Sequence, residues 1–162
     1  MYQLVASAFA LIVLGAAPST ANDRAAEKVI LRIEGILREG HAKEFTRSHL
    51  EALGLTTIRT TTPWHDGVQQ FEGIRLDVLM KTVGAEGKTA HIVALNKYRT
   101  EIPVSDFARF GPILALKRNG QYMEVRDKGP LFVIYPFDNL PELKSELYYS
   151  RSAWQVRAMT LE

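Results

Sequence analysis

The stretch TTTPWHDGVQQFEGIRL, Thr60 to Leu76, decides how the rest of this chain is interpreted. Polar β-branched residues, an aromatic residue and a histidine precede an apolar segment with helical spacing. This order is typical of the approach to an active site ahead of a strand-to-helix turn. The whole chain, however, contains no cysteine. Thiolate metal ligands, thiol nucleophiles and disulfide bonds are therefore excluded.

The overall composition is that of an ordinary globular domain. The chain has 162 residues, of which 46% are hydrophobic and 23% charged, and its net charge is +2. Acidic and basic residues are mixed along the chain, so no basic block indicates a nucleic-acid partner. There is no internal repeat or linker. We expect one domain over residues 22–162.

The first 21 residues have the pattern of a signal peptide. The segment from Leu4 to Ala17 is almost wholly apolar, and Ser19-Thr20-Ala21 fits the small residues before a cleavage point. An apolar run of this length is shorter than the roughly 20 residues that a membrane-spanning helix needs. We expect a periplasmic or secreted protein with no direct membrane insertion after cleavage. An uncleaved anchor or a buried N-terminal helix is the alternative, because no lysine or arginine precedes the apolar run.

Strands are expected to outnumber helices in the mature chain. Alternating or β-branched segments predict strands at 28–36, 55–61, 88–96, 98–104, 129–136 and 153–161, and a hairpin at 112–125. Helical spacing predicts short helices at 47–54, 74–87 and 104–111. Thr46 and Ser105 are the expected caps of the first and third helices, and Asn119-Gly120 suits a type I′ turn. The fold class that follows is α+β, with mixed or antiparallel β-sheets and a few short helices.

Four segments together resemble the molybdopterin-binding domain of the sulfite-oxidase family. They are Trp64 to Ala85 with its Phe-Glu-Gly-Ile-x-Leu core, ALNKYRTEIPVSDF (94–107), KGPLFVIYP (128–136) and SRSAWQV (150–156). Each motif is weak alone, and their shared order is more specific. The resemblance covers roughly residues 58–161 and implies a β-rich domain of that family.

Three positions depart from the family pattern. The family's molybdenum-ligating cysteine falls near Thr61, a cofactor-binding arginine falls at Phe132, and a lysine of the closing loop falls at Ala153. A threonine hydroxyl does not ionise at neutral pH and is a poor substitute for a soft thiolate. The resemblance therefore implies a cleft that persists without molybdenum redox chemistry. Small exported members of this kind resemble periplasmic proteins that bind reduced pterins and signal to a membrane cyclic-di-GMP enzyme.

The residues expected to bind a ligand come from the segments that carry the resemblance. They are Thr61, Trp64, His65, Asn96, Tyr98, Arg126, Asp127, Arg151, Ser152 and Trp154. A planar pterin needs an aromatic wall and a few fixed donors and acceptors. Trp64 is a candidate wall, or a loop aromatic that covers the core, and Trp154 is equally a candidate for core packing.

The polar candidates also have structural alternatives. Arg151 and Ser152 lie where the family's loop approaches a cofactor phosphate, and Asp127 could accept hydrogen bonds from an amino-pyrimidine edge. For Arg126 and Asp127 the alternative is an ordinary surface turn, and Asn96 and Tyr98 belong to a predicted turn.

A longer segment near the C-terminus is a further candidate surface. Residues 135–152 read as a long loop in which Tyr148 and Tyr149 could line a ligand or dock a partner, and Phe137 and Leu140 could form an exposed anchor. The histidines show no metal-ligand spacing, so no metal site is expected.

The sequence leaves three alternative functions. The first is a non-catalytic exported protein that binds a pterin or a related small molecule and regulates a membrane sensor protein. The second is a molybdopterin-dependent oxidoreductase without a protein thiolate ligand. The third is a degenerate domain used only for docking.

Overall fold

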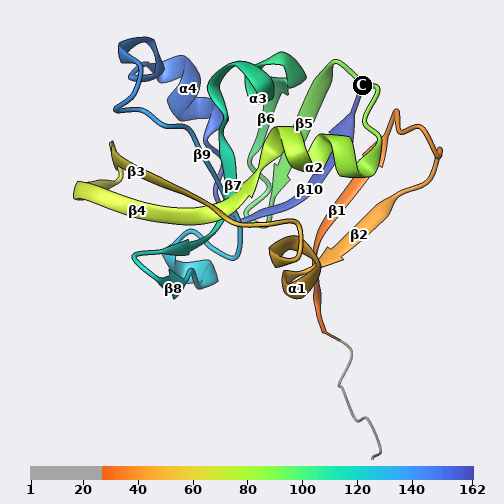
Figure 1. Ribbon diagram of the computed structural model, residues 1–162, viewed down its shortest axis with the longest axis horizontal. Helices are drawn as coiled ribbons and strands as arrows, with labels where there is room; N and C mark the ends of the chain where they lie inside the picture. Colours follow the sequence, from red (N-terminus) through yellow and green to blue (C-terminus); the bar gives the residue numbers. More distant parts are fainter. Residues whose placement is uncertain (1–26) are drawn as a thin grey trace, which may run out of the picture.

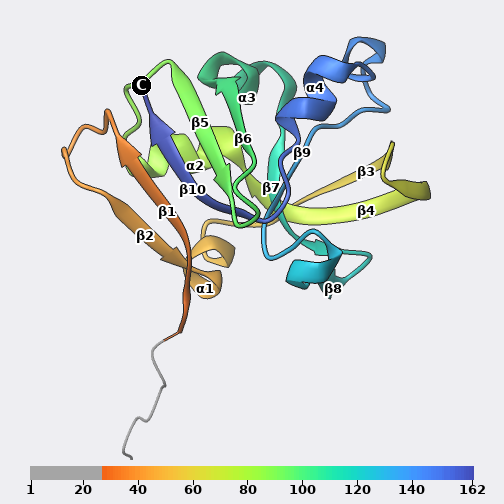
Figure 2. The same cartoon turned by 180° about the vertical axis from the view of Figure 1, so that it is seen from behind.

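The computed structural model describes residues 27–162, and the expected signal peptide at residues 1–21 lies outside them. Figures 1 and 2 show two β-sheets with short helices at their ends and edges. No helix within residues 27–162 is long and apolar enough to cross a membrane.

The first sheet is mixed and has the order β2-β1-β10-β5-β6. Its strands are β1 (Val29–Gly35), β2 (Lys43–Thr46), β5 (Thr89–Ala94), β6 (Arg99–Pro103) and β10 (Val156–Leu161). The parallel pair is β1 with β10, and the other neighbours are antiparallel. The first and last strands of residues 27–162 therefore lie side by side, which closes the fold.

The second sheet is antiparallel and begins with a long hairpin. Its strands are β3 (Thr56–Thr62), β4 (His65–Arg75), β7 (Ile113–Arg118), β8 (Gln121–Tyr122) and β9 (Phe132–Ile134), with β9 paired to β7. The residues directly after Trp64, which we expected to form a polar loop, are the start of the strand β4. Pro63 and Trp64 form the two-residue turn between β3 and β4, which Figure 1 shows reaching toward the side of the molecule that carries α4.

A glycine in β4 explains one motif of the quoted stretch. A side chain at Gly73 would overlap the backbone of Leu114 and Ala115 in β7. Only glycine permits this close approach of the two strands. The Phe-Glu-Gly motif therefore specifies the β4–β7 contact.

The helices are short and mostly begin and end as predicted. They are α1 (Arg47–Glu51), α2 (Leu76–Val83), α3 (Val104–Phe110) and α4 (Glu146–Arg151), with 3-10 turns η1 (Val125–Asp127) and η2 (Pro141–Leu143). Thr46 caps α1, because its Oγ1 accepts a hydrogen bond from the backbone N–H of His49 at 3.2 Å. The prediction that Ser105 caps α3 is wrong, since the cap position is Pro103 and Ser105 lies inside the helix.

The segment 135–152 is more ordered than a loop. It contains η2 and α4, and Phe137 is only 1% exposed, so the expected exposed anchor at Phe137 is wrong. The ring of Phe137 lies against Trp64, Tyr135 and Tyr149. Aromatic packing, which sequence periodicity does not reveal, holds this segment against the core.

Two hydrophobic clusters form the core, and Trp64 packs against both. The larger one contains residues of the first sheet, of the helices α1, α2 and α3, and of β4, β7 and β9 in the second sheet. The smaller one lies on the second sheet around Phe71 and Phe132. The fold is thus a β-rich α+β domain with two mixed or antiparallel sheets and few short helices, which confirms the predicted class.

Candidate ligand-binding site

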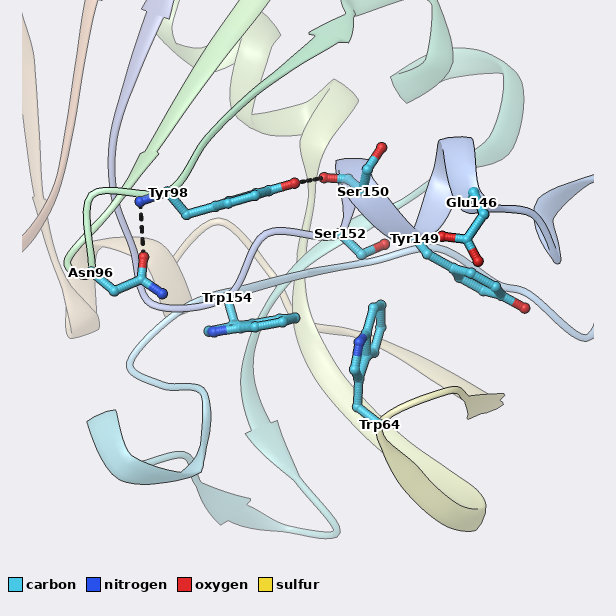
Figure 3. Close-up of a pocket in the computed structure, with 8 residues that line it drawn as sticks. All are labelled: Trp64, Asn96, Tyr98, Glu146, Tyr149, Ser150, Ser152 and Trp154. Atoms are coloured by element: carbon cyan, nitrogen blue, oxygen red, sulfur yellow. Dashed lines mark hydrogen bonds between the residues drawn. The ribbon is translucent and has the colours of Figure 1, made fainter.

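An aromatic-walled hollow opens where the β3–β4 turn, the β5–β6 turn and α4 meet. We call it the aromatic hollow. Its lining residues are Trp64, Asn96, Tyr98, Glu146, Tyr149, Ser150, Ser152 and Trp154, and its volume is about 250 Å³. Figure 3 shows these residues, which come from three segments of the chain (64, 96–98 and 146–154), grouped around a common space. Five of the ten predicted binding residues line it: Trp64, Asn96, Tyr98, Ser152 and Trp154.

Two aromatic rings face each other across this hollow. In Figure 3 the rings of Tyr98 and Trp154 are both seen nearly edge-on, one above the other, with open space between them. The hydroxyl of Tyr98 donates a hydrogen bond to the carbonyl oxygen of Ser150 at 2.7 Å, which fixes the ring against α4. On the other side, the Nζ of Lys128 lies 4.1 Å from the centre of a Trp154 ring. Each wall is therefore held by a contact of its own, Tyr98 by the backbone of Ser150 and Trp154 by the ammonium group of Lys128.

Trp64 closes one end of the hollow. Its ring centre lies 5.6 Å from that of Trp154, 6.0 Å from that of Tyr149 and 5.5 Å from that of Phe132. The ring of Trp64 packs on the core and also lines the hollow, while its role as a wall on which a ligand stacks stays a prediction. Tilted and edge-to-face pairs of this kind stabilise the arrangement beyond the area they bury.

Polar groups stand at the rim of the aromatic walls. The side-chain Oδ1 of Asn96 accepts a hydrogen bond from the backbone N–H of Tyr98 at 3.0 Å, so its amide N–H groups can donate to a ligand. Glu146 is the acidic residue among the lining side chains. Ser152 is buried, and its hydroxyl donates to the carbonyl of Tyr148 at 2.8 Å while its oxygen can still accept. The hollow thus offers donors, a carboxylate acceptor and flat apolar faces.

Sequence reasoning missed Glu146 and Ser150. Both lie on α4, where Glu146, Tyr149 and Ser150 are three and four residues apart and share one face. The expectation of a loop hid this spacing. Helical periodicity over residues 146–151 is the signal that could have found them. Tyr149, which was considered as a ligand-lining residue, does line the hollow.

Thr61 lies at the end of β3 and is engaged elsewhere. Its backbone N–H and its hydroxyl each donate to the carboxylate of Asp138 at 2.6 Å. Asp138 also pairs with Lys144 at 2.7 Å, and the pKa of Asp138 falls to about 2 because Lys144 and Thr61 stabilise its charged form. The hydroxyl at the family's cysteine position therefore joins β3 to the segment before α4.

His65 lies behind Trp64 and not among the hollow's lining residues. It contacts the rings of Phe71 and Phe132 and shares a 2.8 Å hydrogen bond with the hydroxyl of Thr62. Burial, with smaller contributions from Arg118 and Lys128, lowers its pKa to about 4. His65 is thus neutral at physiological pH and forms part of the packing beneath the site.

Three further predicted residues lie outside the hollow's lining. Arg126 and Asp127 sit on the exposed turn η1, where the guanidinium of Arg126 pairs with Glu124 at 2.9 Å. Arg151 points into the protein, and its Nη1 donates to the carboxylate of Asp106 at 2.8 Å. The same carboxylate accepts the hydroxyl of Tyr135 at 3.0 Å. Arg151 therefore secures α4 to α3 and to the core.

The residues present do not fit a molybdopterin cofactor. The position of the family's arginine, Phe132, is fully buried against Trp64, Phe71 and Trp154, and Ala153 is 1% exposed. The two positions at which the resemblance implies cofactor-binding cations thus hold buried apolar side chains. The hydroxyl of Thr61 is hydrogen-bonded to Asp138. Over residues 27–162, no group of three or more His, Asp or Glu side chains is arranged to hold a metal ion.

Comparison with known proteins identifies a structural relative. No protein-family model and no curated protein matches the sequence. The fold is similar to that in the crystal structure of the sulfane dehydrogenase SoxCD from Paracoccus pantotrophus, with a TM-score of 0.60 and 18% sequence identity. The match covers 81% of this chain and 37% of that chain, so the protein corresponds to a little over a third of that longer chain. At this identity the likeness concerns the fold, and it agrees with the sulfite-oxidase-like architecture expected from the sequence.

Proposed function

We propose that this protein is an exported, non-catalytic binding protein for a pterin or a similar planar heterocycle. In this proposal the bound ligand regulates a membrane signalling partner, such as a cyclic-di-GMP enzyme. The observation that carries the proposal is the aromatic hollow, whose opposed Tyr98 and Trp154 rings leave a flat space between them. A planar bicycle fills such a space by stacking on both faces.

The polar rim suits the edge of a pterin. The amino-pyrimidine edge of a pterin presents N–H donors, which a carboxylate accepts. Asp127 was expected to have this role, and Glu146 takes it in the proposal because it lines the hollow. Asn96 can donate to a ring nitrogen or carbonyl on the opposite edge. The resemblance to small exported pterin-binding members of the family points to the same ligand class.

The alternative of a molybdopterin-dependent oxidoreductase has weaker support. The fold similarity to sulfane dehydrogenase SoxCD favours it. The apolar replacements at Phe132 and Ala153 oppose it, because they remove the charges that such a cofactor requires. Stoichiometric molybdenum in protein purified from its native compartment would establish this alternative and overturn our choice.

The proposal is tested by titrating the full-length, exported protein with tetrahydrobiopterin under anaerobic conditions. We expect quenching of tryptophan fluorescence and a higher melting temperature. A ligand at a hundred times its dissociation constant stabilises a protein by about 2.7 kcal/mol. If neither signal changes, and no fluorescent pterin is released when the freshly purified protein is denatured, the docking domain becomes the better account.

A matched pair of tyrosine variants assigns the binding to the hollow. Tyr98 and Tyr122 are 42% and 44% exposed, and each hydroxyl donates one hydrogen bond, to Ser150 and to Glu51. Tyr98→Ala should weaken tetrahydrobiopterin binding by about 1–3 kcal/mol, the usual value of one stacking ring. Tyr122→Ala should leave it unchanged. Equal effects of the two substitutions would place the ligand elsewhere.

A further inference from the structure

A second hollow lies on the surface where β1 and β10 run side by side. We call it the β1–β10 groove. It has a volume of about 150 Å³ and is lined by residues 28–32, 156 and 157 together with Leu95, Val125 and Pro130. Three large apolar side chains meet in it while remaining solvent-exposed: Val29 at 44%, Leu95 at 47% and Val125 at 50%. Exposed apolar side chains that converge in a recess mark an interaction surface more often than scattered ones do.

The charged residues that line this groove are all basic. Its lining includes Lys28, Arg32 and Arg157 and no acidic residue. Arg32 is held by Glu34 at 2.9 Å and Glu44 at 3.1 Å. Within residues 27–162, Lys28 and Arg157 have no acidic side chain within 4.0 Å. The groove is therefore an apolar floor with two available cations at its rim.

Gln155 connects this groove to the aromatic hollow. It directly follows Trp154, and its backbone adopts a left-handed φ of 55°. Its N–H donates to Lys128, its carbonyl accepts from Leu95, and its side-chain amide donates to the carbonyl of Val125, at 3.0, 2.8 and 2.7 Å. Two of these partners, Leu95 and Val125, form walls of the groove. Gln155 therefore joins Trp154 of the aromatic hollow to two walls of the groove.

We propose that the β1–β10 groove docks a segment of a partner protein in which aliphatic side chains are flanked by carboxylates, and that Gln155 couples this docking to the aromatic hollow. The coupling rests on the proposed function, whereas the docking surface does not. Lys28 and Arg157 favour carboxylates in the bound segment by charge complementarity. The apolar residues of the groove favour aliphatic side chains between those carboxylates. A protein segment fits better than an anionic membrane, because the site is recessed and two acidic residues lie near it, Glu34 on β1 and Glu44 on the neighbouring β2.

The docking surface is tested with peptides selected from a random display library against the full-length exported protein. We expect selected peptides to combine aliphatic residues with Asp or Glu. Val125→Asp and Arg157→Glu should each weaken the best peptide at least tenfold by fluorescence anisotropy. The matched control is Val68→Asp, because Val68 is 56% exposed and lies on β4 outside the groove. Recovery of no such peptide, or equal losses in all three variants, would overturn the docking surface.

Vesicles containing phosphatidylglycerol test the membrane alternative. We expect no binding at physiological salt. Binding to vesicles that Val125→Asp and Arg157→Glu abolish would make the groove a lipid site and overturn the proposal.

The coupling is tested by repeating the peptide titration with saturating tetrahydrobiopterin. We expect a change of at least threefold in peptide affinity in the wild type. Gln155→Gly keeps the left-handed backbone accessible and removes the side-chain amide. In this variant tetrahydrobiopterin should alter the peptide affinity less than in the wild type, while the peptide and the pterin each still bind alone. A peptide that binds the groove without any pterin binding would refute the proposed function and the coupling and uphold the docking surface. Pterin binding without groove-dependent peptide binding would refute only the docking surface.

Discussion

At the scale of single residues, the hollow depends on how Thr61, Phe132 and Trp64 are engaged. Thr61 donates its hydroxyl to Asp138, and the ring of Phe132 lies against that of Trp64. Trp64 rests on that ring and bounds the hollow. The quoted stretch thus presents an aromatic ring to the hollow, while the hydroxyl of its Thr61 is engaged by Asp138.

Trp64→Ala tests the double role of this tryptophan. The substitution removes contacts with both core clusters, so we expect a loss of about 2–3 kcal/mol in the free energy of unfolding. It should also weaken tetrahydrobiopterin binding by about 1–3 kcal/mol. Urea denaturation and fluorescence titration measure the two effects. Lower stability with unchanged affinity would show that Trp64 only covers the core.

His65 predicts a pH dependence of stability. Its pKa is about 4 in the folded protein and ordinarily about 6.5, so the unfolded chain takes up the proton first as the pH falls. The contribution of neutral His65 to the free energy of unfolding should therefore be fully present above about pH 6.5 and should be lost as the pH falls from 6.5 to 4. After allowance for partial exposure, the loss is about 1–2 kcal/mol.

Urea denaturation at pH 7 and pH 5 isolates this effect. Asp138, whose pKa is lowered to about 2, contributes stability that is lost only below its ordinary value of 3.8. In His65→Gln the difference between the two pH values should shrink. The same difference in the variant and the wild type would assign the pH dependence to other groups.

At the scale of elements, α4 supplies one side of the hollow and depends on a buried ion pair. Arg151, at its last turn, bonds to Asp106 of α3, which also accepts the hydroxyl of Tyr135. The side chains of Arg151 and Asp106 are mostly buried. This ion pair fixes the orientation of α4 and therefore of the helix face that carries Glu146, Tyr149 and Ser150.

Arg151→Ala should destabilise the fold by about 3 kcal/mol, because it leaves a buried carboxylate without its cation. The matched control is Arg109→Ala, which breaks the exposed pair between Arg109 of α3 and Glu142 at 3.3 Å and should cost less than about 1 kcal/mol. Amide exchange in α4 should also accelerate in Arg151→Ala. If both substitutions cost the same, the buried pair does not hold α4.

At the scale of the whole molecule, most of the fold could be predicted from local pattern and most of the site could not. Apolar alternation predicted β1, β5 and β6, and the left-handed Gly84 ends α2 as expected. The strand β4 was missed because its first residues are polar and exposed at a hairpin tip.

The hollow is assembled from three segments that lie far apart in the sequence: 64, 96–98 and 146–154. Motif order therefore indicated the segments, and only tertiary packing decided that Arg151 turns inward while Glu146 turns toward the hollow.

The most direct test of the central claim is a crystal structure of the protein soaked anaerobically with tetrahydrobiopterin. The account predicts the bicyclic ring between Tyr98 and Trp154, with its amino-pyrimidine edge toward Glu146 and Trp64 at the end of the stack. A ring bound at any other surface, or a hollow that stays empty at saturating ligand, would contradict it.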